Sequence, residues 1–401
     1  MKINVIDSIM GSGKTTSVIN YINNNTNNNK YIYVTPYLNE VNRIINSCKK
    51  KEFKQPEEIG SKINGIKQLL ARGENIVTTH SLFHLFDDEI IELCYSQDYI
   101  LFMDEVTEVV EPYELVYQDI EVLLRDFVTI DDKNMLVWRE DKADYPSNGK
   151  FAEAKRLCEN GSLAMYGGNV VVWLFPIKVF EAFTHSYILT YMFDGQIQKY
   201  YYDFFDLEYN YMHVEGDSIA TYHFVDGADK KDDKGNLGKL INIVSNEKMN
   251  LIGDINFSLS KTWYKNHSDD ILISTLNNNV YNYFRNVLKS SSEENMWTTF
   301  KEYRSLIKGK GYAKGFVPLN ARATNDYAGR HNVAYLVNRY FNPVLKQFFI
   351  NNNIEINEDL YALSEMLQFI WRSAIRNGEE INLYIPSRRM RNLLINWIKN
   401  T

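Results

Sequence analysis

A glycine-rich stretch near the start of the chain, DSIMGSGKTTS at residues 7–17, combines a tightly turning backbone with a lysine and several hydroxyl side chains. It follows the apolar run KINVID (2–7), which predicts a buried parallel strand, and it precedes TTSVINYI, whose spacing predicts a helix. A strand, a glycine turn and a helix in this order are the context in which the phosphate-loop pattern G-x-x-x-x-G-K-[ST] is informative. Residues 8–15 meet that pattern, with serine in the first position. The stretch therefore predicts a site for a nucleoside triphosphate.

Each residue type in this loop suits a different part of the nucleotide. Gly11 and Gly13 allow the backbone to turn so that successive N–H groups point at the β-phosphate. Lys14 is expected to neutralise charge on the β- and γ-phosphates, and the Thr15 hydroxyl to ligate Mg²⁺. The full set expected to bind ATP is Ser8, Gly11, Ser12, Gly13, Lys14, Thr15 and Thr16.

A second apolar run, YILFMDEV (99–106), predicts a buried strand that ends in two carboxylates. Ligands of open α/β sheets lie at the carboxyl ends of the strands, where Asp104 and Glu105 would meet the phosphate loop. Asp104 is expected to hold Mg²⁺ together with Thr15, and Glu105 to polarise the attacking water. The later glutamates, at 108, 111 and 114, fit a solvated acidic surface.

Two further short strands are expected between these motifs. YIYVTP (31–36) ends in Thr-Pro, and NIVTTHSLF (75–83) ends in hydroxyls and a histidine, each followed by a helix-like segment. Hydroxyls and a helix N-terminus at a sheet edge bind phosphates readily, but they are also ordinary helix caps. For these two segments the residues alone leave both interpretations open.

The order of these motifs resembles that of the superfamily 2 helicases, the DExD/H-type ATPases. GSGKTT resembles their first motif, VTP motif Ia, TTHSLF motif Ib and MDEV the DExx box, while YILTYMF (187–193) resembles motif III with Thr190 as its hydroxyl. Two features depart from the family: residues 1–6 leave no room for a Q motif, and the box reads Asp-Glu-Val-Thr. The resemblance implies nucleic-acid contacts from Thr35, Arg43, Thr79, His80, Ser81, Arg322 and Thr324.

The resemblance also implies an α/β fold of two RecA-like lobes, each a parallel sheet flanked by helices, with ATP in the cleft between them. The charged stretch DGADKKDDKGN (226–236) is the expected linker, so lobe one would be 1–225 and lobe two 237–401. The span between the DExx box and motif III exceeds an ordinary connection, which predicts an insertion at about 108–168. The aromatic stretch 200–214 is expected to pack in a core rather than to stack on bases.

Lobe two contains an arginine-bearing helical pattern within residues 362–390. Its apolar positions predict a helix that ends at Asn377-Gly378, followed by the strand INLYIP. Gln368, Arg372 and Arg376 fall at i, i+4 and i+8 and would share a face. The set resembles motif VI, Q-x-x-G-R-x-G-R, although Arg376 comes one residue late and both glycines are replaced. The resemblance implies that the three residues assist catalysis, with the arginines reaching the γ-phosphate across the cleft.

The composition bounds the class of protein. The net charge of −7 excludes a wholly basic nucleic-acid binder but not a local basic groove. The three cysteines have no CxxC spacing, which predicts free thiols in a reducing cytoplasm. The chain shows no signal-like N-terminus and no apolar run long enough to cross a bilayer, so no contact with a membrane is expected. If a phage encodes the chain, the compartment is the cytoplasm of the bacterial host.

The expected function is an ATP- and Mg²⁺-dependent helicase or translocase on single- or double-stranded nucleic acid. DNA is favoured over RNA, and replication or recombination proteins are the expected partners. Two alternatives stay open: a terminase-like packaging ATPase, which needs a C-terminal nuclease, and a nucleotide kinase or other non-motor phosphate-loop protein.

Overall fold

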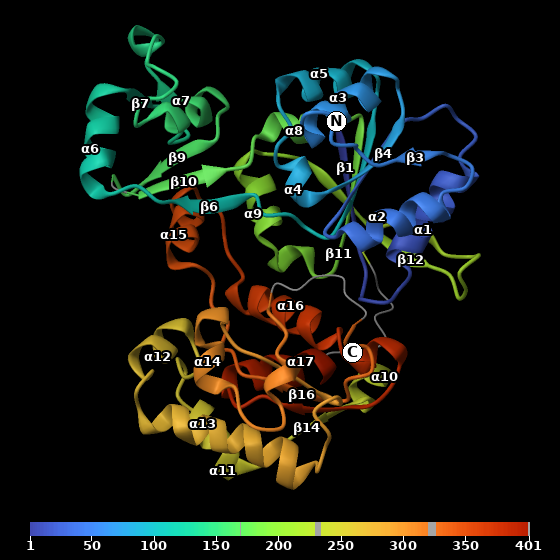
Figure 1. The fold of residues 1–401 in the computed structure, drawn as a ribbon, viewed down its shortest axis with the longest axis vertical. Helices are drawn as coiled ribbons and strands as arrows, with labels where there is room; N and C mark the ends of the chain where they lie inside the picture. Colours follow the sequence, from blue (N-terminus) through green and yellow to red (C-terminus); the bar gives the residue numbers. More distant parts are fainter. Residues whose placement is uncertain (169, 229–233, 320–325, 400–401) are drawn as a thin grey trace. The chain divides into compact units, whose positions relative to one another are not determined.

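The computed structural model describes residues 1–168, 170–228, 234–319 and 326–399 of the chain (Figure 1). The described chain divides into two compact units. The first unit comprises Met1–Ser8, Gly13–Asp229 and Asn342–Ile356, and the second comprises Ile9–Ser12, Lys230–Phe341 and Asn357–Thr401. The expected second lobe, 237–401, is continuous in sequence, whereas the structure groups residues 342–356 within it with the first unit.

One mixed sheet forms the centre of the first unit. Among the described residues its strand order is β13-β12-β1-β11-β5-β2-β4-β3, and every neighbouring pair is parallel except the antiparallel edge pair β12–β13. The strands are β1 (Lys2–Asp7), β2 (Tyr31–Thr35), β3 (Phe53–Lys54), β4 (Asn75–Thr79), β5 (Ile100–Asp104), β11 (His185–Thr190), β12 (Tyr209–Glu215) and β13 (His223–Asp226). The continuous apolar runs predicted strands buried on both faces, and β2 is buried throughout.

Helices cover both faces of this sheet. They are α1 (Lys14–Asn24), α2 (Leu38–Ser47), α3 (Lys62–Ala71), α4 (His80–Phe83), α5 (Asp88–Ser96), α8 (Ile177–Glu181) and α9 (Ile197–Phe204). The apolar faces of α1 and α2 join Tyr31, Phe102 and Leu189 of the sheet in one buried cluster. The aromatic stretch 200–214 forms α9 and β12, and Tyr200, Tyr201 and Tyr202 are almost fully buried, as the packing interpretation predicts.

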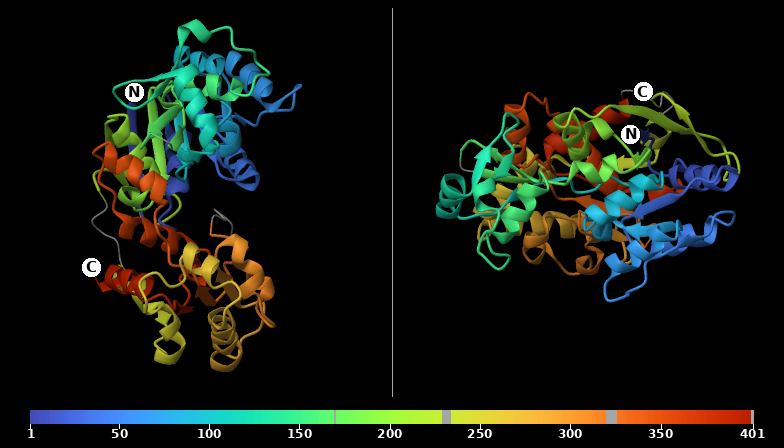
Figure 2. Two further views of the ribbon diagram at one scale, coloured as in Figure 1. Left: turned by 90° about the vertical axis from the view of Figure 1, so that its left-hand side faces the viewer. Right: turned by 90° about the horizontal axis from the view of Figure 1, so that it is seen from above.

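A smaller subdomain follows β5 and extends from the sheet (Figures 1 and 2). It contains β6 (Val110–Tyr113), α6 (Tyr117–Asp126), β7 (Val128–Ile130), β8 (Leu136–Trp138), α7 (Ala152–Glu159), β9 (Leu163–Tyr166) and β10 (Val170–Leu174). It has its own core around Leu123, Trp138 and Leu163. Helix α15 (Pro343–Asn351), from far along the chain, packs nearby: Phe348 lies 5.2 Å from Phe204 between ring centroids.

A fully parallel sheet of order β14-β17-β16-β15 forms the centre of the second unit. Its strands are β14 (Ile241–Ile243), β15 (Asn295–Thr298), β16 (Asn332–Tyr335) and β17 (Ile381–Tyr384). Its helices are α10 (Lys234–Lys239), α11 (Glu247–Asn250), α12 (Lys261–Asn266), α13 (Ile271–Asn282), α14 (Arg304–Ile307), α16 (Glu358–Ile370) and α17 (Arg388–Lys399), with short 3₁₀ turns η3 (Leu251–Gly253) and η7 (Ala374–Asn377).

The predicted helix through Arg376 is wrong beyond Ile370. The Ser373 hydroxyl donates to the carbonyl oxygen of Ile370 at 2.6 Å, and the Ala374 N–H turns away to the carbonyl of Arg330 at 2.9 Å. These bonds replace the next helical bonds and end α16. Arg372 and Arg376 therefore follow the helix, so they do not share a helical face with Gln368.

No helix of the described chain combines the length and the apolar character that a bilayer span requires. The three cysteines, Cys48, Cys94 and Cys158, are buried free thiols, which agrees with the expectation of unpaired cysteines.

Candidate nucleotide site

The phosphate-loop segment joins β1 directly to α1. Gly11 and Gly13 both take the left-handed backbone conformation, with φ of 83° and 87°, which glycine adopts without a steric cost. Gly13 is the N-cap of α1, and no side chain caps this helix end. The N–H groups in the first turn of a helix are where a phosphate site places its anion, and this loop leads directly into that turn. The Lys14 ammonium bends back to the carbonyl oxygen of Ser8 at 2.5 Å.

The acidic residue of the DExx box meets the loop at the same sheet edge. The Thr15 hydroxyl donates to Oδ2 of Asp104 at 3.2 Å, and the Tyr33 hydroxyl lies 3.4 Å from the same oxygen. Burial, followed by the negative charge of Glu105, raises the pKa of Asp104 to about 7, whereas Lys14 lowers it. A hydroxyl and a carboxylate are hard oxygen ligands that suit Mg²⁺ bound by few protein groups, so these two residues fit the ion.

Glu105 has an unusual backbone. Its φ is 68°, in the left-handed region that a non-glycine residue adopts at a cost of about 1–3 kcal/mol. Its N–H donates to the carbonyl oxygen of Leu189 on β11 at 2.9 Å, which helps to hold this conformation. Strained backbone of this kind clusters at functional sites, and here it directs the residue that follows Asp104.

The sequence interpretation missed Asp7, the last residue of β1. Its two carboxylate oxygens accept the N–H groups of Met192 and Phe193, at 2.8 and 2.9 Å, just beyond β11. Burial raises the pKa of Asp7 to about 6, against the lowering effect of these two bonds and of Lys14. A carboxylate at the end of a buried strand, directly before the phosphate loop, was the available signal.

The residues expected to contact nucleic acid differ in accessibility. Thr35 is fully buried, so its side chain is not at the surface of this structure. Thr79 and His80 are half-buried, and Nε2 of His80 lies 2.9 Å from the carbonyl oxygen of Asp104. Ser81 and Arg43 are exposed, and Arg43 pairs with Glu40 at 3.0 Å. Arg322 and Thr324 lie outside the described residues.

The remaining residues of the predicted site differ in their contacts and in their exposure to solvent. The Ser8 hydroxyl accepts the Val214 N–H at 2.9 Å and so helps to hold β12, while Ser12 and Thr16 are half-buried in or beside the loop. In the second unit Gln368 is half-buried and Arg376 is exposed.

Arg372 is only 5% exposed and donates to the carbonyl oxygens of Pro318 and Leu319, at 3.4 and 3.1 Å. Its guanidinium also lies over the Phe369 ring, 5.6 Å from the centroid. These contacts give Arg372 a structural role in this conformation.

The parallel sheets flanked by helices, with strand-end residues gathered at one edge, define an α/β protein whose C-terminal part is Rossmann-like. The model of the YonV C-terminal Rossmann-like domain matches residues 235–398, and that of the YonV middle domain matches residues 110–173. The SPbeta prophage-derived uncharacterized protein YonV of Bacillus subtilis (strain 168) is 40% identical over 410 residues, covering 100% of this chain and 99% of that protein. The chain belongs to the YonV family.

The fold is also similar to that of a solved structure, Xpd4 of S. tokodaii. The TM-score is 0.51 at 10% sequence identity, and the match covers 98% of this chain and 94% of the other. At this identity the likeness concerns the fold alone. The middle-domain match at 110–173 falls within the subdomain that follows β5, near the expected insertion at about 108–168.

Proposed function

We propose that the protein is an ATP-dependent motor of the superfamily 2 type, which couples ATP hydrolysis to movement along, or unwinding of, nucleic acid. The observation that carries the ATPase part is the hydrogen bond between Thr15 and Asp104, 89 residues apart in sequence. It brings the loop threonine and the box aspartate together at the carboxyl edge of a parallel sheet, where a triphosphate and its metal would lie.

Each residue of the first unit has a defined task in this proposal. The N–H groups in the first turn of α1 and the Lys14 side chain bind the phosphates, and Thr15 with Asp104 holds Mg²⁺. The ion supplies charge neutralisation on the β- and γ-phosphate oxygens. Glu105 orients the attacking water and accepts its proton.

The motor part of the proposal concerns the coupling of ATP hydrolysis to nucleic acid. It rests on the fold likeness to Xpd4 and on the order of the motifs. Arg372 is buried and Arg376 is exposed, so Arg376 is the arginine of this segment whose side chain is accessible to a ligand.

The decisive experiment measures ATP turnover of the full chain with single-stranded DNA, double-stranded DNA, RNA or no nucleic acid, beside Lys14→Ala as the inactive control. Stimulation of several-fold or more by DNA, lost in the control, is the expected result. Turnover that no nucleic acid changes would favour the non-motor phosphate-loop alternative. The terminase alternative needs a nuclease centre, and no cluster of three or more metal-binding side chains occurs within the described ranges.

A further inference from the structure

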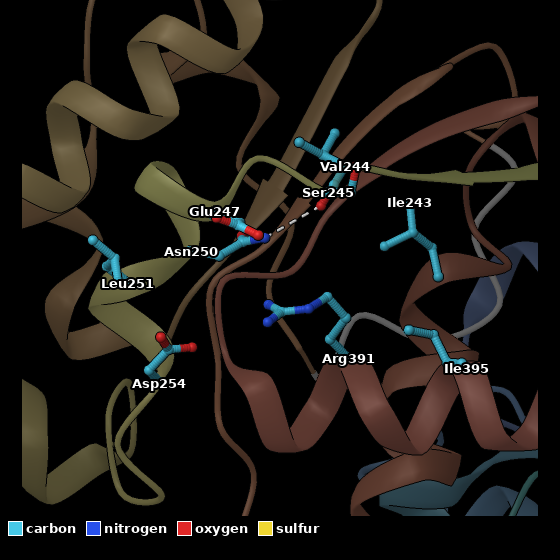
Figure 3. Close-up of a pocket in the computed structure, with 9 residues that line it drawn as sticks. All are labelled: Ile243, Val244, Ser245, Glu247, Asn250, Leu251, Asp254, Arg391 and Ile395. Atoms are coloured by element: carbon cyan, nitrogen blue, oxygen red, sulfur yellow. Dashed lines mark hydrogen bonds between the residues drawn. The ribbon is translucent and has the colours of Figure 1, made fainter.

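A pocket of about 480 Å³ opens in the second unit (Figure 3). Ile243, at the end of β14, forms one side, and Glu247, Asn250 and Asp254 follow it along the chain. Arg391 and Ile395 of α17 also line the pocket. Arg391 also donates through Nη1 to the carbonyls just beyond β17, those of Ile385 and Pro386, at 2.7 and 3.0 Å. The pocket therefore lies at the carboxyl ends of two neighbouring parallel strands.

The chain changes direction at this position in the sheet. β14 pairs with β17, but the next strand in sequence, β15, lies at the opposite edge, and the chain returns through β16 to β17. Because parallel crossovers are right-handed, connections that run in opposite directions lie on opposite faces of a sheet. The crevice between such strand ends is where open α/β sheets bind ligands.

Two polar groups in this pocket have unused hydrogen-bonding capacity. Asn250 is 5% exposed, and its Nδ2 donates to the carbonyl of Val244 at 3.4 Å, but its Oδ1 has no partner within the part of the chain that the structure describes. Arg391 commits Nη1 to backbone carbonyls, and its guanidinium group extends toward the side on which Asn250 and Asp254 lie (Figure 3). Buried polar groups of native proteins normally have partners, so an unpaired acceptor beside a cavity indicates a ligand.

The lining selects the chemistry of that ligand. Glu247 and Asp254 carry two negative charges against the single positive charge of Arg391, which disfavours a phosphate group. The pocket instead presents donors from Arg391 toward the side of Asn250 and Asp254, while the aliphatic side chains of Ile243 and Ile395 lie together on the other side of Arg391 (Figure 3). The edge of a nucleobase carries adjacent donors and acceptors on a flat apolar ring, and arginine and carboxylate side chains are established partners for such edges.

We propose that this pocket holds one unpaired base of a nucleic-acid strand bound by the second unit. The inference rests on the proposed function, because it requires that the chain bind nucleic acid. The base would accept hydrogen bonds from Arg391 and donate to Asp254 and to Oδ1 of Asn250, while its sugar and phosphate stay in solvent at the mouth of the pocket.

The experiment compares intact and fully abasic single strands of equal length, because only the intact strand can place a base in the pocket. Equilibrium affinities of the full chain are measured without ATP. Arg391→Gln should weaken binding of the intact strand about 10-fold, as for one good base contact, and change binding of the abasic strand less than about 2-fold. Arg388→Gln is the matched control, since it removes the same charge one turn earlier on α17 from an exposed residue outside the pocket lining. It should affect both strands equally.

Asp254→Asn provides a second test that does not depend on the backbone bonds of Arg391. Removing a negative charge should tighten the binding of any phosphate backbone, whereas loss of a base acceptor should weaken the intact strand selectively. We expect weaker binding of the intact strand and unchanged or tighter binding of the abasic strand. Thermal denaturation of each variant establishes that it is folded.

Several results would overturn the inference. Equal losses for both strands in Arg391→Gln, or tighter binding of both in Asp254→Asn, would assign the pocket to a phosphate. Unchanged affinities in both variants would remove the pocket from nucleic-acid binding. Competition by a free nucleoside monophosphate, with no selective effect on the strands, would assign it to a soluble nucleotide. If the wild-type chain binds no strand at all, the proposed function itself fails, which is a separate outcome.

Discussion

The contact between Gly13 and the ring of Tyr222 makes the phosphate loop sensitive to one added methyl group. A Cβ atom built on Gly13 would lie 2.7 Å from two carbon atoms of that ring, far inside van der Waals contact. The backbone that carries the ring is held in place, because Asn20 of α1 donates to the carbonyls of Tyr222 and Ile219, at 3.0 and 2.9 Å. Gly13→Ala should therefore destabilise the first unit through two separate effects.

The two effects can be separated, because Gly11 carries only one of them. Gly11 and Gly13 have φ of 83° and 87°, and alanine in this region costs about 1–2 kcal/mol. No atom of the described residues lies within 4 Å of a Cβ on Gly11, so Gly11→Ala should cost no more than that. Gly13→Ala should cost about 1–3 kcal/mol in addition, the usual penalty for overpacking. At roughly 2–4 °C per kcal/mol, the melting temperature should fall further for Gly13→Ala than for Gly11→Ala.

Thermal denaturation of both variants, and of Gly13→Ala combined with Tyr222→Ala, measures these terms. Truncating the ring removes the overlap but not the backbone strain, so the double variant should lose only about as much as Gly11→Ala relative to the Tyr222→Ala background. Equal losses for the two glycine variants, or no rescue by Tyr222→Ala, would refute the proposed packing of the ring on the loop.

The remaining predictions concern turnover and the second unit. Lys14→Ala should abolish ATP hydrolysis and lower the melting temperature only slightly, through loss of the bond to the Ser8 carbonyl; wild-type turnover would contradict the phosphate-loop assignment. Glu105→Gln should still bind ATP, but the rate of hydrolysis should fall by about 100-fold or more, because an amide cannot act as a base. Binding assays beside single-turnover kinetics distinguish the two steps. Arg372→Ala should destabilise the second unit by about 2–3 kcal/mol, since two carbonyls lose a charged donor. Arg376→Ala should leave the melting temperature unchanged and lower nucleic-acid-stimulated ATP turnover. If instead Arg376→Ala lowers the melting temperature and Arg372→Ala lowers turnover, Arg376 is the structural residue and Arg372 the catalytic one.

The sheet edge of the first unit was predictable because its signals are local. Apolar runs fixed β1, β2, β4 and β5 as buried strands, and the carboxyl ends of parallel strands must meet at one edge. It follows that Thr15 and Asp104 approach each other although the sequence separates them by 89 residues.

The arginine segment of the second unit was not predictable from the same kind of signal. The spacing of Gln368, Arg372 and Arg376 assumes that the helix continues, but it ends at Ile370, where the Ser373 hydroxyl donates to the Ile370 carbonyl and the Ala374 N–H makes a tertiary bond to the Arg330 carbonyl. Periodicity carries no information about such partners. The pocket of the second unit was not predictable from the sequence for a related reason. Its lining residues Asn250 and Arg391 are 141 positions apart, and no lining residue belongs to a motif.

Asp7 belongs to none of the sequence motifs, yet it helps to hold the backbone next to residues that do. Its carboxylate accepts two N–H groups from Met192 and Phe193, and Met192 has a left-handed φ of 57°. Across the same edge the Glu105 N–H donates to Leu189 in β11. The ends of β1, β5 and β11 are thus joined by three hydrogen bonds, and two of the joined residues, Glu105 and Met192, have strained backbones. Strain of this kind persists only where the surroundings hold it, so the bonds that constrain this edge keep the residue proposed as general base fixed beside the phosphate loop before any nucleotide binds.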